Sequence, residues 1–336
     1  MMLKGGTWTA TITGIGAYVP DSRLTNADLE KIVDTSDEWI VQRTGIRERR
    51  ICAPDQFTSD LCEAAVSDML ARYPVHLDDT ELVIVATHTP DFPFPPVSCQ
   101  IQDRFGLSRA GAVDLNATCA GFVYALHLAN GLVSAGIHSK ILVIGADAMS
   151  KITDYTDRST CILFGDGAGA VLIERKRGEH QEAVFLGSQL GADGSGGIHL
   201  YRTGIANKMN GIPLKDTSRL VQNGREVYKW AVQTVPEGVR QLSDQAGVPL
   251  EEVDWLVPHS ANLRMIESIC SRIGFPIEKT LYSMVWYGNT SAASIPLALS
   301  DAAREGRIKA GDMMMLYGFG GGMTHAGMLI RWPLNG

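Results

Sequence analysis

Short apolar runs alternate with amphipathic segments along most of this chain. Residues 9–17 alternate β-branched and small side chains, and residues 81–87 (ELVIVAT) form an almost continuous apolar run, so both segments predict β-strands. Residues 58–72 carry apolar side chains at helical spacing and predict an amphipathic helix. The longest apolar stretch, 119–137, is interrupted by polar residues, which is typical of a buried core helix and too polar for a membrane span.

The same order of predicted elements occurs twice. The first half also contains short helices starting near Thr25 and Ser36, a helix over 97–105, and strands over 113–116, 140–146 and 168–174. The correspondences pair 251–259 with 82–88, 262–274 with 99–106, 281–294 with 113–122, 312–317 with 140–144, and 327–331 with 169–173. A long-period duplication at low identity indicates two related domains, over 1–176 and 177–336. Strands that alternate with helices and are apolar on both faces imply parallel-rich sheets sandwiched by helices.

Composition and charge narrow the possible functions. The chain has 336 residues, 45% of them hydrophobic and 20% charged, which suits an ordinary globular protein of one large or two smaller domains. A net charge of -7 argues against general nucleic-acid binding. Six scattered cysteines without C-x-x-C spacing suggest reduced thiols in a cytoplasmic protein, and the start of the chain lacks the apolar segment of a signal peptide. No metal-ligand spacing, Walker A sequence or complete dinucleotide fingerprint is present, so no metal is expected.

Cys119 lies where the predicted strand over 113–116 turns into the long apolar helix. A cysteine at the start of a helix lies at the positive end of the helix dipole, beside unpaired backbone N–H groups. Both features favour the thiolate, which is the nucleophilic form. The neighbours Ala117, Ala120 and Gly121 are small enough for a substrate carbonyl to approach. The alternative is that Cys119 is a buried small hydrophobe, as free cysteines usually are.

His259 and Asn289 follow two apolar segments of the second half, as Cys119 follows one in the first. Ligands bind beyond the carboxyl ends of strands in such sheets, so the three residues converge if the halves pack face to face about a pseudo-two-fold axis. Cysteine, histidine and asparagine together fit acyl-thioester chemistry. The alternatives are a structural histidine, an asparagine that only caps a turn, and a cysteine protease, which the duplicated architecture does not suggest.

The glycine-rich segment 318–322 (GFGGG) lies between two predicted strands. Its glycines either turn a hairpin or bring a backbone N–H close to a substrate carbonyl. In the second case the N–H groups of Cys119 and Gly321 form an oxyanion hole, in which one donor is worth about 3 kcal/mol in acyl-transfer enzymes.

With these residues in place, the chain resembles the ketoacyl synthase III enzymes, the 3-oxoacyl-[acyl-carrier-protein] synthase III family of the thiolase superfamily. The resemblance covers nearly the whole chain. The motifs that carry it are TSDEWI (35–40), RTGIR (43–47), NATCAGF (116–122), TDR (156–158), FGDGAG (164–169), PHSANLR (258–264) and YGNTS (287–291). The sequence as a whole resembles the second isoform of Gram-positive bacteria. This resemblance favours branched-chain primers.

The resemblance implies an α/β, thiolase-like fold: two duplicated halves with mixed five-stranded sheets in an αβαβα layered sandwich. It implies that Cys119 accepts an acyl primer from acyl-CoA, and that His259 and Asn289 bind the thioester carbonyl of malonyl-acyl carrier protein. Loss of CO2 leaves an enolate that these donors stabilise, and its carbon attacks the acyl-cysteine. The product, a 3-oxoacyl carrier protein, starts fatty-acid synthesis. The family is homodimeric and uses no prosthetic group.

The resemblance also implies roles for residues around this centre. Thr35, Trp39, Arg43, Arg158, Asn262 and Arg264 correspond to residues that bind CoA, Lys229 and Arg264 to residues at the carrier-protein surface, and Phe94, Phe164 and Phe319 to residues of the acyl pocket. In the dimeric family, Phe94 reaches across to the partner's pocket. The basic residues would form a positive mouth suited to an acidic carrier. For any single lysine or arginine the alternative is ordinary solvated surface charge.

Three positions depart from the family pattern: Pro96 stands where serine is usual, Ser260 where glutamine is common, and Thr118 where alanine is common. The first leaves the shape of the acyl pocket open. Two other functions stay open as well. One is an acyltransferase or thioester hydrolase of secondary metabolism that does not condense its substrates, and the other is a non-catalytic scaffold that binds carrier protein.

Overall fold

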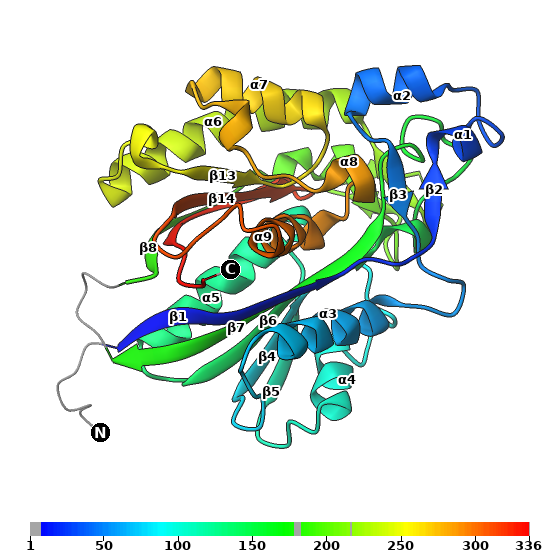
Figure 1. Cartoon of the computed structure of the whole chain (residues 1–336). Coiled ribbons are helices and arrows are strands. Elements are labelled where there is room, and N and C mark those ends of the chain that lie inside the picture. Colours follow the sequence, from blue (N-terminus) through cyan, green and yellow to red (C-terminus); the bar gives the residue numbers. More distant parts are fainter. Residues whose placement is uncertain (1–7, 178–182, 216, 336) are drawn as a thin grey trace.

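The computed structural model describes residues 8–177, 183–215 and 217–335. The first seven residues, on which the expectation about a signal peptide rests, lie outside this description. Figure 1 shows two sheets with a pair of helices between them and further helices on both outer faces. This arrangement is the five-layered αβαβα sandwich expected from the sequence. No helix in the described part of the chain is long and apolar enough to cross a lipid bilayer.

The first sheet has five strands and comes entirely from the part of the chain before residue 178. Its order is β1-β7-β6-β4-β5, with β4 parallel to β5 and β6 and the other pairs antiparallel. The strands are β1 (Trp8–Tyr18), β4 (Leu82–Ala86), β5 (Gly111–Leu115), β6 (Lys140–Ala148) and β7 (Asp166–Arg177). Every residue of β6 is buried because the sheet is covered on both faces.

The second sheet departs from the expectation of five strands. Its order is β13-β14-β15-β8, in which only β13 and β14 are parallel, and it contains four strands among the described residues. These are β8 (Phe185–Ala192), β13 (Trp255–Pro258), β14 (Met313–Gly320) and β15 (Thr324–Arg331). The segment expected as the fifth strand pairs only through two isolated bridges, of Thr280 with Leu256 at its start and of Asn289 with Phe164 at its end. Between them the chain forms a short helix, α8 (Met284–Tyr287), so no continuous ladder is made.

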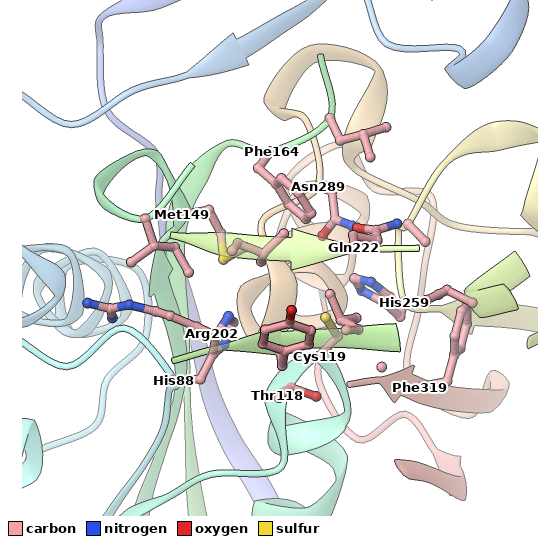
Figure 2. A pocket seen from close by; sticks show the side chains of 18 of the residues that line it. His88, Thr118, Cys119, Met149, Phe164, Arg202, Gln222, His259, Asn289 and Phe319 are labelled. Atoms are coloured by element: carbon pink, nitrogen blue, oxygen red, sulfur yellow. The ribbon is translucent and has the colours of Figure 1, made fainter. Parts of the chain in front are cut away.

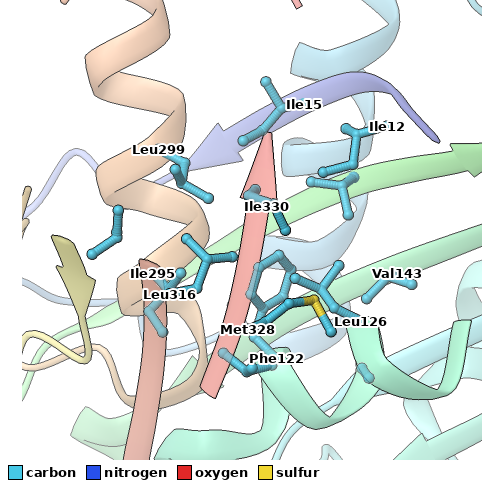
Figure 3. Close-up of a cluster of buried hydrophobic side chains, with 14 of the residues drawn as sticks. Ile12, Ile15, Phe122, Leu126, Val143, Ile295, Leu299, Leu316, Met328 and Ile330 are labelled. Atoms are coloured by element: carbon cyan, nitrogen blue, oxygen red, sulfur yellow. The ribbon is translucent and has the colours of Figure 1, made fainter. Parts of the chain in front are cut away.

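The middle layer consists of α5 (Gly121–Ser134) and α9 (Ser294–Arg304), one helix from each half. Their apolar side chains, including Phe122, Leu126, Ile295 and Leu299, form one core with side chains of both sheets (Figure 3). Burying a side chain of this size contributes about 1.5–3 kcal/mol. The two halves therefore share their largest hydrophobic core.

The outer helices cover the remaining face of each sheet. Helices α3 (Thr58–Arg72) and α4 (Val97–Arg104) cover the first sheet, and α6 (Gly224–Ala246) covers the second, with α7 (Leu263–Ile273) packed beside it (Figure 1). The predicted bounds of α3 agree with the structure at both ends.

Small elements gather near one end of the sandwich. They are the antiparallel pair of β2 (Arg23–Thr25) and β3 (Glu48–Arg50), the helices α1 (Asn26–Leu29) and α2 (Asp37–Thr44) between them, and the pairs β9 (Leu200–Arg202) with β12 (Leu220–Gln222) and β10 (Lys208–Met209) with β11 (Ile212–Pro213). Ser36 caps the start of helix α2, where its hydroxyl accepts the N–H of Trp39, and Gly45 caps the end in the left-handed region.

Candidate active site

A cavity of about 450 Å³ lies where the two halves meet. Cys119, His259 and Asn289 all line it, and each side chain is less than 10% exposed. Figure 2 shows the three side chains around one space, with Phe164 and Phe319 among the walls. The convergence expected from the duplication is therefore present in the structure.

Cys119 lies in a 3₁₀ turn, Thr118–Ala120, that leads from β5 into α5. Thr118 precedes it with a φ of 46°, and its hydroxyl donates to the carbonyl oxygen of Gly321 at 2.9 Å. The start of α9 repeats this turn, with Ser291 at a φ of 53°. The structural counterpart of Thr118 is therefore Ser291. The expected correspondence of 281–294 with 113–122 aligned the ends of these ranges, which pairs Thr118 with Thr290 and is wrong by one residue. The two ranges differ in length, so the sequence did not show this register.

Burial opposes the thiolate that the position of Cys119 at a helix start was expected to favour. Burial raises the pKa of the Cys119 thiol to about 12, and a hydrogen bond from Ser291 opposes that rise only in part. Removing solvent from a charged sulfur outweighs the favourable position at the helix start. Cys119 is therefore a thiol at neutral pH, and its thiolate fraction increases as the pH rises.

His259 directly follows β13 and is held from two sides. Its backbone N–H donates to the carbonyl oxygen of Tyr317 at 2.8 Å, and its Nδ1 lies 2.8 Å from the hydroxyl oxygen of Ser294. That oxygen already accepts the N–H of Ser260 at 3.2 Å, which leaves the Ser294 proton for Nδ1. This assignment places the ring proton on Nε2, on the side of the imidazole away from Ser294.

The His259 ring is uncharged at physiological pH. Burial lowers its pKa to about 3, although the charge of Asp147 acts in the opposite direction. Phe319 packs edge-on against the ring, with 5.2 Å between the ring centroids. A neutral imidazole in this apolar setting can donate a hydrogen bond to a substrate oxygen without first losing a proton.

We expect Ser294→Ala to slow malonyl decarboxylation about tenfold, because Nδ1 loses its donor and the ring tautomer is no longer fixed. Acylation of Cys119 should change less than twofold. CO2 release from malonyl carrier protein and intact mass after acyl-CoA treatment measure the two steps separately. Ser300→Ala is the matched control, since that hydroxyl lies on the same helix and accepts from Arg72 instead. Equal losses in both steps would contradict the role given to Ser294.

The backbone of Asn289 bridges the two halves. Its N–H donates to the carbonyl oxygen of Leu163 at 2.8 Å, and its carbonyl oxygen accepts the N–H of Gly165 at 3.1 Å. A Cβ on Gly165 would lie 1.9 Å from the carbonyl oxygen of Tyr287, so only glycine fits there. The side-chain Oδ1 accepts the N–H of Ser291 at 2.9 Å. Asn289 thus caps a turn with its oxygen and keeps its NH₂ group for a ligand.

The predicted oxyanion-hole donors lie on adjoining segments. Gly320 packs so tightly on the turn that a Cβ there would lie 3.0 Å from Cys119 Sγ. Gly321 follows directly and lines a neighbouring hollow together with Thr118. The role of the Gly321 N–H stays a prediction.

The predicted CoA residues of the first half form a cluster outside the cavity. The guanidinium groups of Arg43 and Arg158 lie 5.6 and 5.0 Å from the ring centroid of Trp39. Arg158 also pairs with the exposed Asp34, next to the half-buried Thr35. The arrangement offers an aromatic surface flanked by two cations, as a nucleotide ligand requires.

The predicted residues of the second half lie on the outer helices α6 and α7. Asn262 caps α7 by accepting the N–H of Met265 at 2.9 Å and also lines the cavity. Arg264 on α7 and Lys229 on α6 are exposed. Tyr228 joins these helices through a 2.6 Å hydrogen bond to Ser268.

The three phenylalanines predicted for the acyl pocket do not all lie in the cavity. Phe164 and Phe319 line the cavity and are buried. Phe94 is 83% exposed and does not line it, although Pro90 and Pro93 of the same loop do. A role for Phe94 in a partner's pocket stays a prediction. In the described part of the chain, no group of three or more His, Cys, Asp or Glu side chains could hold a metal ion.

Sequence reasoning missed three polar residues beside the nucleophile: His88, Asp147 and Ser291. The signal for His88 was present in the repeat, because His88 follows β4 as His259 follows β13. Asp147 and Ser291 carried no signal, since an acidic residue inside a strand and a serine after threonine are both common.

Comparisons with known proteins agree with this geometry. The family model described as 3-oxoacyl-[acyl-carrier-protein] synthase III matches residues 113–194, and the model of its C terminal matches residues 243–332. Beta-ketoacyl-[acyl-carrier-protein] synthase III 2 of Halalkalibacterium halodurans is 60% identical over 325 residues, which are 97% of each chain. The protein of the same name from Bacillus subtilis is 57% identical over 97% of this chain and 99% of its own.

Solved structures agree as well. The β-ketoacyl-[acyl carrier protein] synthase III of Thermus thermophilus has a TM-score of 0.90 at 46% identity, covering 96% of this chain and 98% of that one. The priming β-ketosynthase of the R1128 polyketide pathway also has a TM-score of 0.90, at 32% identity, covering 100% of this chain and 99% of that one. The thiolase-like fold expected from the sequence is confirmed.

Proposed function

Because this chain belongs to the 3-oxoacyl-[acyl-carrier-protein] synthase III family, we propose that Cys119, His259 and Asn289 perform the family's decarboxylating condensation in one cavity. The reaction joins an acyl-CoA primer to malonyl-acyl carrier protein and releases CoA and CO2, which initiates fatty-acid synthesis. The observation that carries the assignment is the meeting of a thiol from the first half with an imidazole and a carboxamide from the second.

The first step transfers the acyl group to Cys119. The sulfur attacks the thioester carbonyl, the new C–S bond forms, and the bond to the CoA sulfur breaks. The proton lost by the cysteine thiol is matched by the proton that the departing CoA thiolate gains. The N–H groups of Cys119 and Gly321 stabilise the oxyanion between these events.

The second step forms the carbon nucleophile without a strong base. The His259 Nε2–H and the Asn289 NH₂ group donate to the thioester carbonyl oxygen of the malonyl group. Breaking the C–CO2 bond leaves its electron pair in an enolate, which both donors stabilise in a cavity with apolar walls. The enolate carbon attacks the acyl-cysteine, and the Cys119 sulfur leaves with the electrons of the broken C–S bond. Neutral His259 suits this role, because an imidazole that donates a hydrogen bond need not accept a proton.

Substrates enter past basic residues. Trp39 and Arg158 receive the CoA adenine, with Thr35, Arg43 and Asn262 near the rest of the CoA. Lys229 and Arg264 receive the carrier protein. Although the whole chain has a net charge of -7, the four basic side chains of this set give the proposed entrance a local positive charge. Such a surface steers an acidic carrier toward the site.

The working unit is a cytoplasmic homodimer without a prosthetic group. The edge strand β5 exposes Val113, and the loop before α4 exposes Phe92 and Phe94. A partner copy that covers these side chains would bury them, and Phe94 would complete the partner's acyl pocket.

A panel of acetyl-, isobutyryl-, isovaleryl- and longer acyl-CoAs with malonyl carrier protein tests the function. We expect an acyl adduct on Cys119 and a product two carbons longer than the primer, with branched primers preferred. An adduct without the longer product would instead indicate a non-condensing acyltransferase or hydrolase. No adduct with any primer would indicate a non-catalytic carrier-binding scaffold.

A further inference from the structure

A buried carboxylate lies behind the active-site cavity. Neither this carboxylate nor the groups that donate hydrogen bonds to it have a role in the mechanism above. Asp147, near the end of β6, is fully buried. Its Oδ1 accepts the hydroxyls of Thr87 and Thr89 at 3.0 and 2.9 Å and the backbone N–H groups of His88 and Thr89 at 3.0 and 3.2 Å. Its Oδ2 accepts the N–H of Ala292 at 3.1 Å, from the other half of the chain.

Asp147 is ionised in this setting. Burial alone would raise the pKa of its carboxyl group, but the interaction with His88 and the hydrogen bonds it accepts outweigh burial and hold the pKa below its usual range. A buried carboxylate is retained only with such partners.

The carboxylate fixes the ring of His88. Nδ1 of His88 lies 3.1 Å from Asp147 Oδ1, so this nitrogen carries a proton that points toward the carboxylate. The His88 side chain is 13% exposed and lines the same cavity as Cys119. Figure 2 shows it on the side of Cys119 away from His259.

Ser291 connects this ring to the nucleophile. Its hydroxyl oxygen lies 3.4 Å from His88 Nδ1, and its hydroxyl donates to Cys119 Sγ at 3.3 Å. With its proton directed at sulfur, the Ser291 hydroxyl faces the imidazole through its oxygen lone pairs, so this oxygen can share the Nδ1 proton that Asp147 accepts at the shorter distance. The contacts form a continuous path from Asp147 through His88 and Ser291 to the sulfur.

Cys119 needs a donor of this kind. Its thiol is buried, and the charge of Asp147 disfavours a nearby thiolate further. His259 is neutral and supplies no compensating charge. In the described structure, the Ser291 hydroxyl is the one side-chain group that donates a hydrogen bond to the Cys119 sulfur.

We propose that Ser291 is a catalytic residue of the acylation step, which donates to the Cys119 sulfur as it becomes a thiolate, and that His88 and Asp147 are positioning residues that orient the Ser291 hydroxyl. The proposal rests on the proposed function, because it assigns the activation of the same nucleophile. It adds no reactant: the hydroxyl keeps its proton throughout, and the bonds made and broken are those of acyl transfer.

Alkylation of Cys119 by iodoacetamide across pH, followed by intact mass, tests the donor directly. We expect Ser291→Ala to lower the alkylation rate about tenfold at each pH where the protein stays folded, as a pKa of the Cys119 thiol about one unit higher requires, and to slow acylation by acyl-CoA about tenfold near neutral pH. CO2 release from malonyl carrier protein should change less than twofold, because the Ser291 backbone N–H that holds Asn289 is retained. The matched control is Thr290→Val, since the buried Thr290 hydroxyl finds no hydrogen-bond partner among the residues that the structure describes. An unshifted alkylation profile in Ser291→Ala would overturn the proposal.

His88 is tested by a double-mutant cycle. We expect His88→Gln alone to slow acylation about threefold and to add nothing in the Ser291→Ala background, because it acts only through that hydroxyl. Additive effects would overturn its role as a positioning residue. If Ser291→Ala does not fold, the rate of Cys119 alkylation in His88→Gln at a fixed pH decides the matter, and an unchanged rate counts against the proposal. Failure of the proposed function looks different, since the unmodified protein would then form no acyl adduct on Cys119.

Discussion

Cys119→Ala is expected to abolish acylation by acyl-CoA and to lower condensation more than a thousandfold. No other thiol lies in the cavity among the described residues, so the two-step reaction through an acyl-enzyme has no alternative route. The variant should still release CO2 from malonyl carrier protein, because His259 and Asn289 are untouched. Intact mass after acyl-CoA treatment and product mass after addition of malonyl carrier protein measure the two losses.

The matched control for this change is Cys99→Ala. Cys99 is the exposed free cysteine among the described residues, and it lies on α4 away from the cavity. We expect this variant to be acylated and to condense like the unmodified protein. An adduct that persists in Cys119→Ala and disappears in Cys99→Ala would reassign the nucleophile.

Asn289→Ala is expected to spare acylation of Cys119 while lowering decarboxylative condensation by about 10²–10³. Removing one preorganised donor from a developing oxyanion has an effect of this size in acyl-transfer enzymes. The acylation step does not use the Asn289 NH₂ group, so the acyl adduct should form at a rate within about threefold of the unmodified protein. The checks are the rate of CO2 release and the intact mass of the acyl-enzyme.

Asn289→Asp separates loss of the donor from loss of local structure. An aspartate keeps an oxygen that can accept the Ser291 N–H, but it places a second oxygen where the NH₂ group was. We expect it to lose as much condensation as Asn289→Ala and to retain the melting temperature better. Unchanged condensation in either variant would refute the role of Asn289 in binding the malonyl carbonyl.

Local physics made much of the first half predictable. The helix over Thr58–Arg72 was predicted with its correct bounds, because the spacing of its apolar residues and the loops beside it depend only on residues that are close in the sequence. The buried strand β4 was predicted for the same reason. In the second half, the segment after Thr280 was misread, since a strand exists only if a neighbouring strand completes its hydrogen bonds.

The sequence alone determined the family, the duplicated architecture and the three residues that meet in the cavity, because motifs and strand ends are properties of short stretches of chain. Only the tertiary structure decided how those residues are tuned. It buries Cys119 so that its pKa rises instead of falling, and it holds His259 neutral beside Ser294. It also brings Asp147, His88 and Ser291 to the back of the nucleophile from segments up to 203 residues apart. Solvent exclusion and contacts between distant segments arise only when both halves close around one core.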